Sequence, residues 1–239
     1  MILSAAIVAR VAVRFSVAIS VMSIGVAFAA PASGQTVTDA RVWTGFVAQG
    51  RMADGSPWRW SCDTLVRMRE GASTLDFLSG RLIISRNITR RSTVGAGYAY
   101  GSGFPDDGGT FGEHRFLQQY IWSVSTGTAS LSLRTRVEER LIEGDSGALV
   151  RTRQHVRVSR SLSAGGQFQF VASEEVFLYA NTTARASRGF DSSRVFAGVR
   201  RAVTPRTGVE IGYVNIYARI RSGPNRRSHV LSANLVASF

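Results

Sequence analysis

Residues 131–141 have the sequence Leu-Ser-Leu-Arg-Thr-Arg-Val-Glu-Glu-Arg-Leu, and side chains of two classes alternate along this stretch. One row is apolar except for Thr135 and the interruption at Glu139, and it holds Leu131, Leu133, Val137 and Leu141. The other row holds Ser132, Arg134, Arg136, Glu138 and Arg140. Successive side chains of a strand point to opposite faces, so the pattern predicts a strand with one apolar and one charged face. A transmembrane barrel strand needs both faces, because lipid contacts one and a polar interior the other.

Two-faced segments of this kind recur along residues 57–239, with turn signals such as Thr204-Pro205-Arg206-Thr207-Gly208 between them. The reversals alternate between short ones (near 89–91, 125–128, 163–166 and 203–207) and longer ones (near 101–112, 142–147, 181–191 and 221–228). Outer-membrane barrels have short periplasmic turns and longer outer loops. We therefore expect an all-β fold, a closed antiparallel transmembrane β-barrel of about 10–12 strands that spans residues 35–239.

The strand count depends on residues 41–52, which alternate poorly. About ten strands follow from residue 57 onward, and this segment would add one more. Single-chain bacterial barrels have even counts, with both termini in the periplasm. The sequence therefore predicts either that 41–52 is not a barrel strand or that a further pairing lies nearby.

The first 34 residues are interpreted as a secretory signal peptide. Arg10 and Arg14 form a basic segment, and an apolar run of mostly small residues follows up to Ala30. Small residues precede two candidate cleavage points, after Ala29 and after Gly34.

The last strand is two-faced as well, and the chain ends at Phe239. An amphipathic final strand with a terminal phenylalanine resembles the signal by which bacterial outer-membrane barrels are delivered to their assembly machinery. We expect that machinery, outer-membrane lipid and lipopolysaccharide as partners, and the cell outer membrane as the location.

Composition argues against several other classes. The formal net charge is +13, and all 29 basic residues are arginines, but these are dispersed rather than clustered among aromatics, so we expect no nucleic-acid partner. Cys62 is the only cysteine, which excludes an intrachain disulfide and a cysteine metal site. His114, His155 and His229 are far apart and in no metal-ligand spacing, so we expect no metal and no cofactor.

Several short motifs together resemble a family of proteobacterial outer-membrane proteins, the domain of unknown function 2490. They are Gly97-Tyr98-Ala99-Tyr100, Glu113-His114-Arg115-Phe116-Leu117-Gln118-Gln119, Arg134-Thr135-Arg136-Val137-Glu138-Glu139-Arg140, Glu174-Glu175-Val176-Phe177, Gly189-Phe190-Asp191-Ser192-Ser193-Arg194 and Glu210-Ile211-Gly212-Tyr213-Val214-Asn215. They occur in the family's order and span most of residues 41–239. The pair Ser192-Ser193 departs from the Gln-Asn expected there. The resemblance implies the barrel fold and the outer-membrane location, and it implies no chemistry.

The charged rows predict a network in the barrel interior. Its members are Glu113, Arg115, Arg134, Arg136, Glu138, Arg140, Arg151, Arg153, Glu175, Arg194 and Glu210. The interior of a small barrel is little wider than its side chains, and buried charges are costly unless paired. We therefore expect ion pairs that fill the interior of a structural, non-enzymatic barrel.

Two other functions stay open. Surplus arginines would favour anions in a narrow pore. A lipid- or lipopolysaccharide-modifying enzyme would need a nucleophile and a base near the outer rim, for which His114 beside Glu113, with Ser102 or Ser192, offers the only candidates. No nucleophile motif surrounds either serine, so we assign no catalytic residue. His155 and His229 are expected to form hydrogen bonds in the interior, and Cys62 to face lipid.

Overall fold

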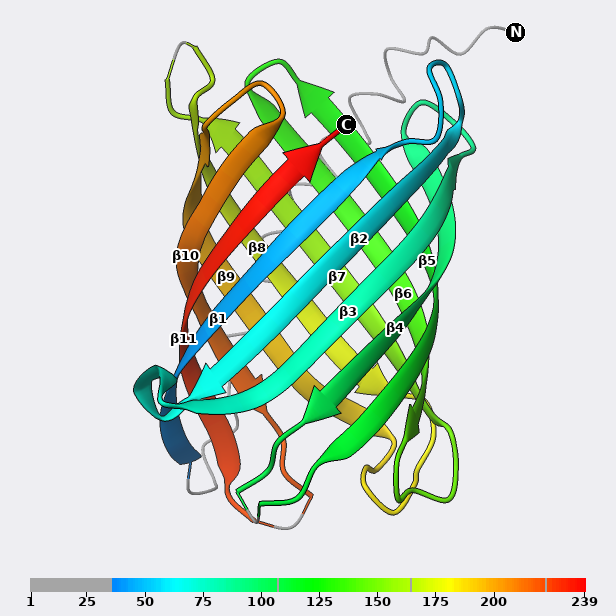
Figure 1. The fold of residues 1–239 in the computed structure, drawn as a ribbon, viewed down its shortest axis with the longest axis vertical. Coiled ribbons are helices and arrows are strands. Elements are labelled where there is room, and N and C mark those ends of the chain that lie inside the picture. The colour runs from blue at the N-terminus through cyan, green and yellow to red at the C-terminus, as the bar shows by residue number, and fades with distance from the viewer. Residues whose placement is uncertain (1–35, 107, 164, 222) are drawn as a thin grey trace, which may run out of the picture. The chain divides into compact units, whose positions relative to one another are not determined.

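A computed structural model describes residues 36–239 except 107, 164 and 222, and these residues form a closed barrel of eleven strands (Figure 1). The predicted signal peptide lies outside the described residues. The strands are β1 (Thr36–Arg51), β2 (Trp58–Arg69), β3 (Thr74–Asn87), β4 (Ser92–Gly103), β5 (Phe111–Thr126), β6 (Ala129–Ile142), β7 (Leu149–Ser161), β8 (Phe168–Tyr179), β9 (Gly189–Ala202), β10 (Thr207–Ala218) and β11 (Asn225–Ser238). One 3-10 turn, Glu70–Ala72, is the helical element of these residues, and none of their helices is long and apolar enough to span a membrane.

The predicted all-β barrel is confirmed, but its closure differs from the expectation. Each strand pairs with its sequence neighbours in antiparallel fashion, whereas β1 pairs with β11 in parallel, from Thr36 beside Asn225 to Gln49 beside Ser238. An odd number of strands that alternate in direction leaves the first and last pointing the same way, so the closing pair must be parallel. Residues 41–52 lie almost entirely in β1, and no twelfth strand is formed by the described residues. The expectation of an even count was therefore wrong.

The connections between strands are longer on average at one end of the barrel than at the other. One end holds the 3-10 turn and the described residues of connections 104–110, 143–148, 180–188 and 219–224 (Figure 1). The other end holds the described residues of connections 52–57, 88–91, 127–128, 162–167 and 203–206. We call these the long-loop end and the short-turn end. The tightest connection is Gly127-Thr128, where Gly127 has a φ of +45° that suits a two-residue hairpin turn. Thr36 lies at the long-loop end and Phe239 at the short-turn end.

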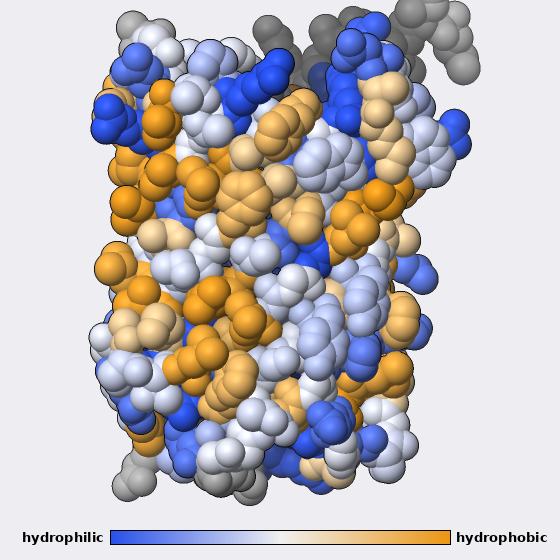
Figure 2. Space-filling view, in the orientation of Figure 1, coloured by the Kyte–Doolittle hydropathy of each residue, from blue (hydrophilic) through white to orange (hydrophobic). Residues whose placement is uncertain are grey.

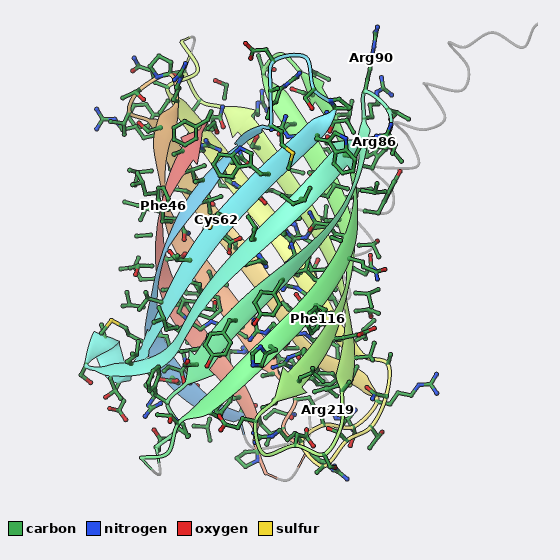
Figure 3. The ribbon with its side chains drawn as sticks, turned by 45° about the vertical axis from the view of Figure 1, so that its right-hand side comes forward. Phe46, Cys62, Arg86, Arg90, Phe116 and Arg219 are labelled. Carbon is green, nitrogen blue, oxygen red and sulfur yellow. The ribbon has the colours of Figure 1, made fainter. Side chains whose placement is uncertain are left out.

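Side chains alternate between a buried row, which faces the interior, and an exposed row on the outer wall. In β6, Arg136 and Glu138 are each 1% exposed, whereas Val137 between them is 39% exposed. The predicted facing of this strand is confirmed. Figure 2 shows apolar side chains over the middle of one face and more hydrophilic ones toward the two ends. Phe46, Cys62 and Phe116 lie on the outer wall (Figure 3), and Cys62 is exposed there as expected.

Part of the interior is apolar, which the charged rows did not predict. A buried cluster is formed by side chains from β1, β8, β9, β10 and β11. It consists of Trp43, Val171, Phe196, Val214, Ile216 and Val230. A smaller cluster of Ile142, Leu149 and Ala186 lies at the long-loop end. The inner row of β4 is made of small residues, and at Gly101 and Gly103 neighbouring phenylalanine rings fill the space of a side chain. A Cβ at Gly101 would lie 2.4 Å from Cζ of Phe77.

Cysteine cross-links should test the parallel closure. In a Cys62→Ser background, Val42→Cys with Leu231→Cys and Phe46→Cys with Leu235→Cys should both form disulfides, because each pair is in register across β1 and β11. Adjacent strands lie about 4.8 Å apart, within disulfide range. The exchanged pairs, 42 with 235 and 46 with 231, are offset by about 13 Å and should stay reduced.

Non-reducing electrophoresis and peptide mass spectrometry would identify the linked pairs. Cross-linking of both exchanged pairs, with neither in-register pair linked, would show an antiparallel seam and contradict the observed closure.

Candidate functional site: the arginine-rich interior

The buried rows of β5, β6 and β7 bring charged side chains together because these strands are in register. Glu138 of β6 is the direct neighbour of Arg151 on β7, and Arg136 is the direct neighbour of Arg153. On the other side, Arg140 is beside Arg115 of β5. Cross-strand neighbours have Cβ atoms about 5 Å apart, so side chains of opposite charge reach each other without backbone distortion.

Glu138 is the most heavily paired carboxylate of the interior. Its Oε2 accepts hydrogen bonds from Nη2 and Nε of Arg151 at 2.6 and 3.1 Å, and its Oε1 accepts one from Nη1 of Arg153 at 2.6 Å. Nη1 of Arg136 lies 3.6 Å from the same Oε1. Three guanidinium groups thus surround a carboxylate that water hardly reaches, the setting in which an ion pair gains most and an unpaired charge costs most.

Glu175 on β8 extends this arrangement across the next strand. Arg153 donates to it through Nε and Nη2, both at 2.9 Å, in the two-pronged geometry that guanidinium and carboxylate share. Arg134 donates to Oε1 of Glu175 at 2.7 Å. Arg153 therefore links two carboxylates on two strands, and β6, β7 and β8 are joined by side chains as well as by their backbones.

Glu113 anchors a second group nearer the long-loop end. Arg115 donates to its two oxygens from Nε at 2.8 Å and Nη2 at 2.6 Å, and Nε of Arg140 also donates to it. Nη1 of Arg140 then reaches the hydroxyl of Tyr179 at 2.9 Å. These contacts join β5 and β6 to the end of β8.

Other ion pairs involve residues that the sequence analysis did not name. Glu210 pairs with Arg157, which was missed although it continues the inner row of Arg151 and Arg153. Asp63 pairs with Arg81 across β2 and β3 at 2.9 Å. A further chain of charges near the long-loop end consists of Asp39, Arg41, Asp76, Arg69 and Asp106. The alternate spacing of charges in β2 and β3 was the available signal for these pairs.

Arg67 and Arg194, both of which stack on interior aromatic rings, have no carboxylate partner among the described residues. Arg194 is a member of the predicted network. In the described residues, no carboxylate oxygen lies within 4.0 Å of a guanidinium nitrogen of Arg67 or of Arg194. Instead, Arg194 stacks on the rings of Phe177 and Trp43 at 4.3 and 5.1 Å, and Arg67 stacks on Trp43 and Phe77 at 4.6 and 5.2 Å. Cation–π contact offsets part of the cost of burying these charges.

The enzyme candidates are distributed over both faces of the wall. His114 is exposed on the outer face, where its Nδ1 lies 2.6 Å from the hydroxyl of Tyr98, whereas Glu113 is buried inside with its arginines. Ser102 lies in the outer row of β4 and Ser192 is buried in β9. No hydrogen bond joins either serine to His114 in the described structure.

The remaining histidines differ from each other. His155 lies in the inner row of β7, beside Arg134 and Glu175 in register. His229 is exposed on the outer wall, with Nδ1 next to the hydroxyl of Tyr213, so the expectation that it points inward was wrong. The alternation of β11 was the available signal, because His229 shares the outer row with Leu231, whereas the buried row is Ser228, Val230 and Ser232. No cluster of three His, Cys, Asp or Glu side chains suited to a metal occurs within residues 36–239 as described.

A family model described as a protein of unknown function (DUF2490) matches residues 40–227. This range includes Glu113, Glu138 and Glu175 and the arginines that bind them. The chain belongs to the DUF2490 family. The resemblance carried by the short motifs is thereby confirmed. Among relatives, an uncharacterised protein of Methylorubrum extorquens (strain AM1) is 27% identical over 217 residues, which cover 90% of this chain and 94% of that protein.

Two solved structures are similar to this DUF2490 barrel in fold. The NanC porin has a TM-score of 0.49 and 11% identity, over 78% of this chain and 93% of its own. LpxR from Salmonella typhimurium has a TM-score of 0.46 and 8% identity, over 76% of this chain and 83% of its own. At such low identity and similarity, neither structure indicates the chemistry of this chain.

Replacement of Glu138 should destabilise the barrel strongly. Glu138→Gln removes the charge that three buried guanidinium groups share, and breaking a buried pair costs about 3–5 kcal/mol. The matched control is Glu139→Gln, one residue along the same strand but exposed on the outer wall, which should change stability by less than about 0.5 kcal/mol.

The free energy of unfolding in urea is measured for both variants. The fraction of folded barrel at each urea concentration is read from its electrophoretic mobility, which changes when the barrel is unfolded by heat. Equal effects of the two substitutions would contradict the importance of the buried pairs.

Proposed function

We propose that this DUF2490 barrel resides in the outer membrane as a non-enzymatic protein whose interior is closed by arginine–carboxylate pairs. The observation that supports closure most directly is Glu138, 1% exposed and held by arginines from its own strand and from β7. An open aqueous channel would leave such a carboxylate in contact with water.

The outer wall supports the membrane location. Large apolar side chains are exposed on most strands, among them Phe46, Leu82, Phe116, Leu133 and Ile211. Monomeric soluble proteins rarely expose contiguous apolar surface of this extent. Lipid and lipopolysaccharide are the partners that suit it, since a bilayer contacts apolar residues on every side of a barrel.

The C-terminal strand supports assembly by the outer-membrane machinery. In β11, Leu231 and Leu235 are exposed on the outer wall, and the exposed Phe239 follows the strand at the short-turn end. In the orientation usual for bacterial barrels, short turns face the periplasm, so the long-loop end faces outward. This orientation places Thr36, the first residue of β1, at the outer side.

A narrow anion-favouring pore is the second candidate, and one observation favours it. Arg67 and Arg194 are surplus to the carboxylates that pair in the described interior, and unpaired guanidinium groups along a path would attract anions. Closure and conduction make opposite demands on the same side chains, so one experiment separates them.

Planar-bilayer recording of the refolded protein should show no stable conductance in the wild type. Glu138→Gln should also remain silent, since it loosens pairs without removing any side chain from the interior. Stepwise currents with anion selectivity in the wild type would overturn closure and establish the pore. Hydrolysis of a phospholipid or lipopolysaccharide that is lost in His114→Ala would overturn both and make the protein an enzyme.

A further inference from the structure

A small cavity lies in the barrel interior, among the arginines. Its volume is about 140 Å³. A water molecule in the liquid occupies about 30 Å³, so the cavity has room for a few water molecules or for a small oxyanion. Strands from β2 to β7, and β9, contribute to its wall. Its charged lining residues are Asp63, Arg67, Arg81, Arg115, Glu138, Arg140, Arg151, Arg153 and Arg194. Seven guanidinium groups and two carboxylates thus line the cavity.

The two carboxylates of the lining are already engaged. Asp63 accepts a hydrogen bond from Arg81 at 2.9 Å, and Glu138 is shared by three arginines. The neighbouring carboxylates Glu113 and Glu175 are each bound by two arginines as well. Positive charge therefore exceeds negative charge around the cavity.

Arg67 and Arg194 hold the unpaired part of that charge. The Nε atom of each is buried with no hydrogen-bond acceptor among the described residues, and so is Nε1 of Trp43, the ring on which both guanidinium groups stack. Buried donors without an acceptor are costly, and buried charges without a counter-charge more so. Stacking orients the guanidinium groups but provides no acceptor.

We propose that this cavity binds a small oxyanion, of the class of phosphate, between Arg67 and Arg194. A guanidinium group donates two parallel hydrogen bonds to phosphate or carboxylate oxygens, a geometry that chloride cannot match. Such an anion would supply both the acceptors and the charge that the protein lacks there. This site rests on the closed interior proposed above. The bound anion would complete the ion pairs that close the barrel.

Phosphate should raise the unfolding temperature of the refolded wild type at constant ionic strength set with chloride, since a ligand that binds the folded state stabilises it. Arg67→Gln and Arg194→Gln should each weaken phosphate binding at least about tenfold, the effect of losing one charge-assisted hydrogen bond. Equilibrium dialysis with labelled phosphate gives the affinity and stoichiometry directly. Acetate as a second probe distinguishes a carboxylate from a tetrahedral anion.

The matched control is Arg86→Gln. Arg86 is also a guanidinium stacked on an indole, 5.6 Å from the ring of Trp58, but it lies on the outer wall near the short-turn end (Figure 3). It should keep the phosphate response of the wild type. If either interior variant fails to fold, the other is compared with the control.

The absence of phosphate and acetate binding in the wild type, or a response equal in interior and control variants, would overturn the site. Bilayer recording tests closure separately. A conducting barrel whose phosphate binding is lost in Arg67→Gln would refute closure and retain the site, whereas a silent barrel without binding would refute the site alone.

Discussion

The pairing of a few buried carboxylates with many arginines is the interaction on which the rest of this barrel depends. Alternate residues of each strand face opposite sides of the wall, and the inner rows of β5, β6, β7 and β8 carry most of the charged side chains of these four strands. The charged side chains of the interior leave a cavity of about 140 Å³ among them. Charges from β5, β6, β7 and β8 therefore meet in one small volume. The structure accommodates them because each of Glu113, Glu138 and Glu175 lies between guanidinium groups from more than one position.

The closing seam depends on a different kind of contact. On the side of β1, β10 and β11, the interior contains the apolar cluster around Trp43 and Val230. Hydrophobic packing thus supports the parallel pair, in addition to the ion pairs of Arg41 with Asp39 and Asp76. Ion pairs predominate among β5, β6, β7 and β8. Trp43 belongs to both regions, since it packs in the cluster and presents its ring to Arg67 and Arg194. β1 therefore closes the wall and also provides the surface on which the unpaired arginines rest.

This division explains how far the sequence could predict the structure. The fold and the facing of β6 followed from alternation, because Arg136 and Glu138 contrast sharply with Val137. β1 gave no such contrast: its inner row includes Trp43 and Gly45, and its outer row includes Thr44. A strand that faces an apolar interior is apolar on both sides, so periodicity does not reveal it. The parallel seam was missed for the same reason, since the strand count depended on that segment.

The site was less predictable than the fold. The alternation of side chains along each strand predicts which residues share the interior. Which of them form ion pairs depends on the register between strands and on how far each side chain reaches. Arg157 reaches Glu210 from β7 across to β10, a contact between strands that are not neighbours. Arg194 lies in register with Glu175, yet its guanidinium group stacks on Phe177 instead of joining the carboxylate. Three arginines meet at that one ring, and Arg153 and Arg134 occupy Glu175.

The complete absence of lysine is consistent with this interior. A guanidinium group is planar, so it can donate to a carboxylate along its edge and stack on an aromatic ring with its face. Arg153 does both at once, donating to Glu138 and Glu175 while it lies 4.7 Å from the ring of Phe177. An ammonium group is a compact, strongly hydrated charge that would lose its water here without gaining the stack. Close packing of like charges is therefore possible because aromatic rings separate the arginines and carboxylates bridge them. Where the carboxylates run out, at Arg67 and Arg194, the same geometry is left open to an anion from outside the chain.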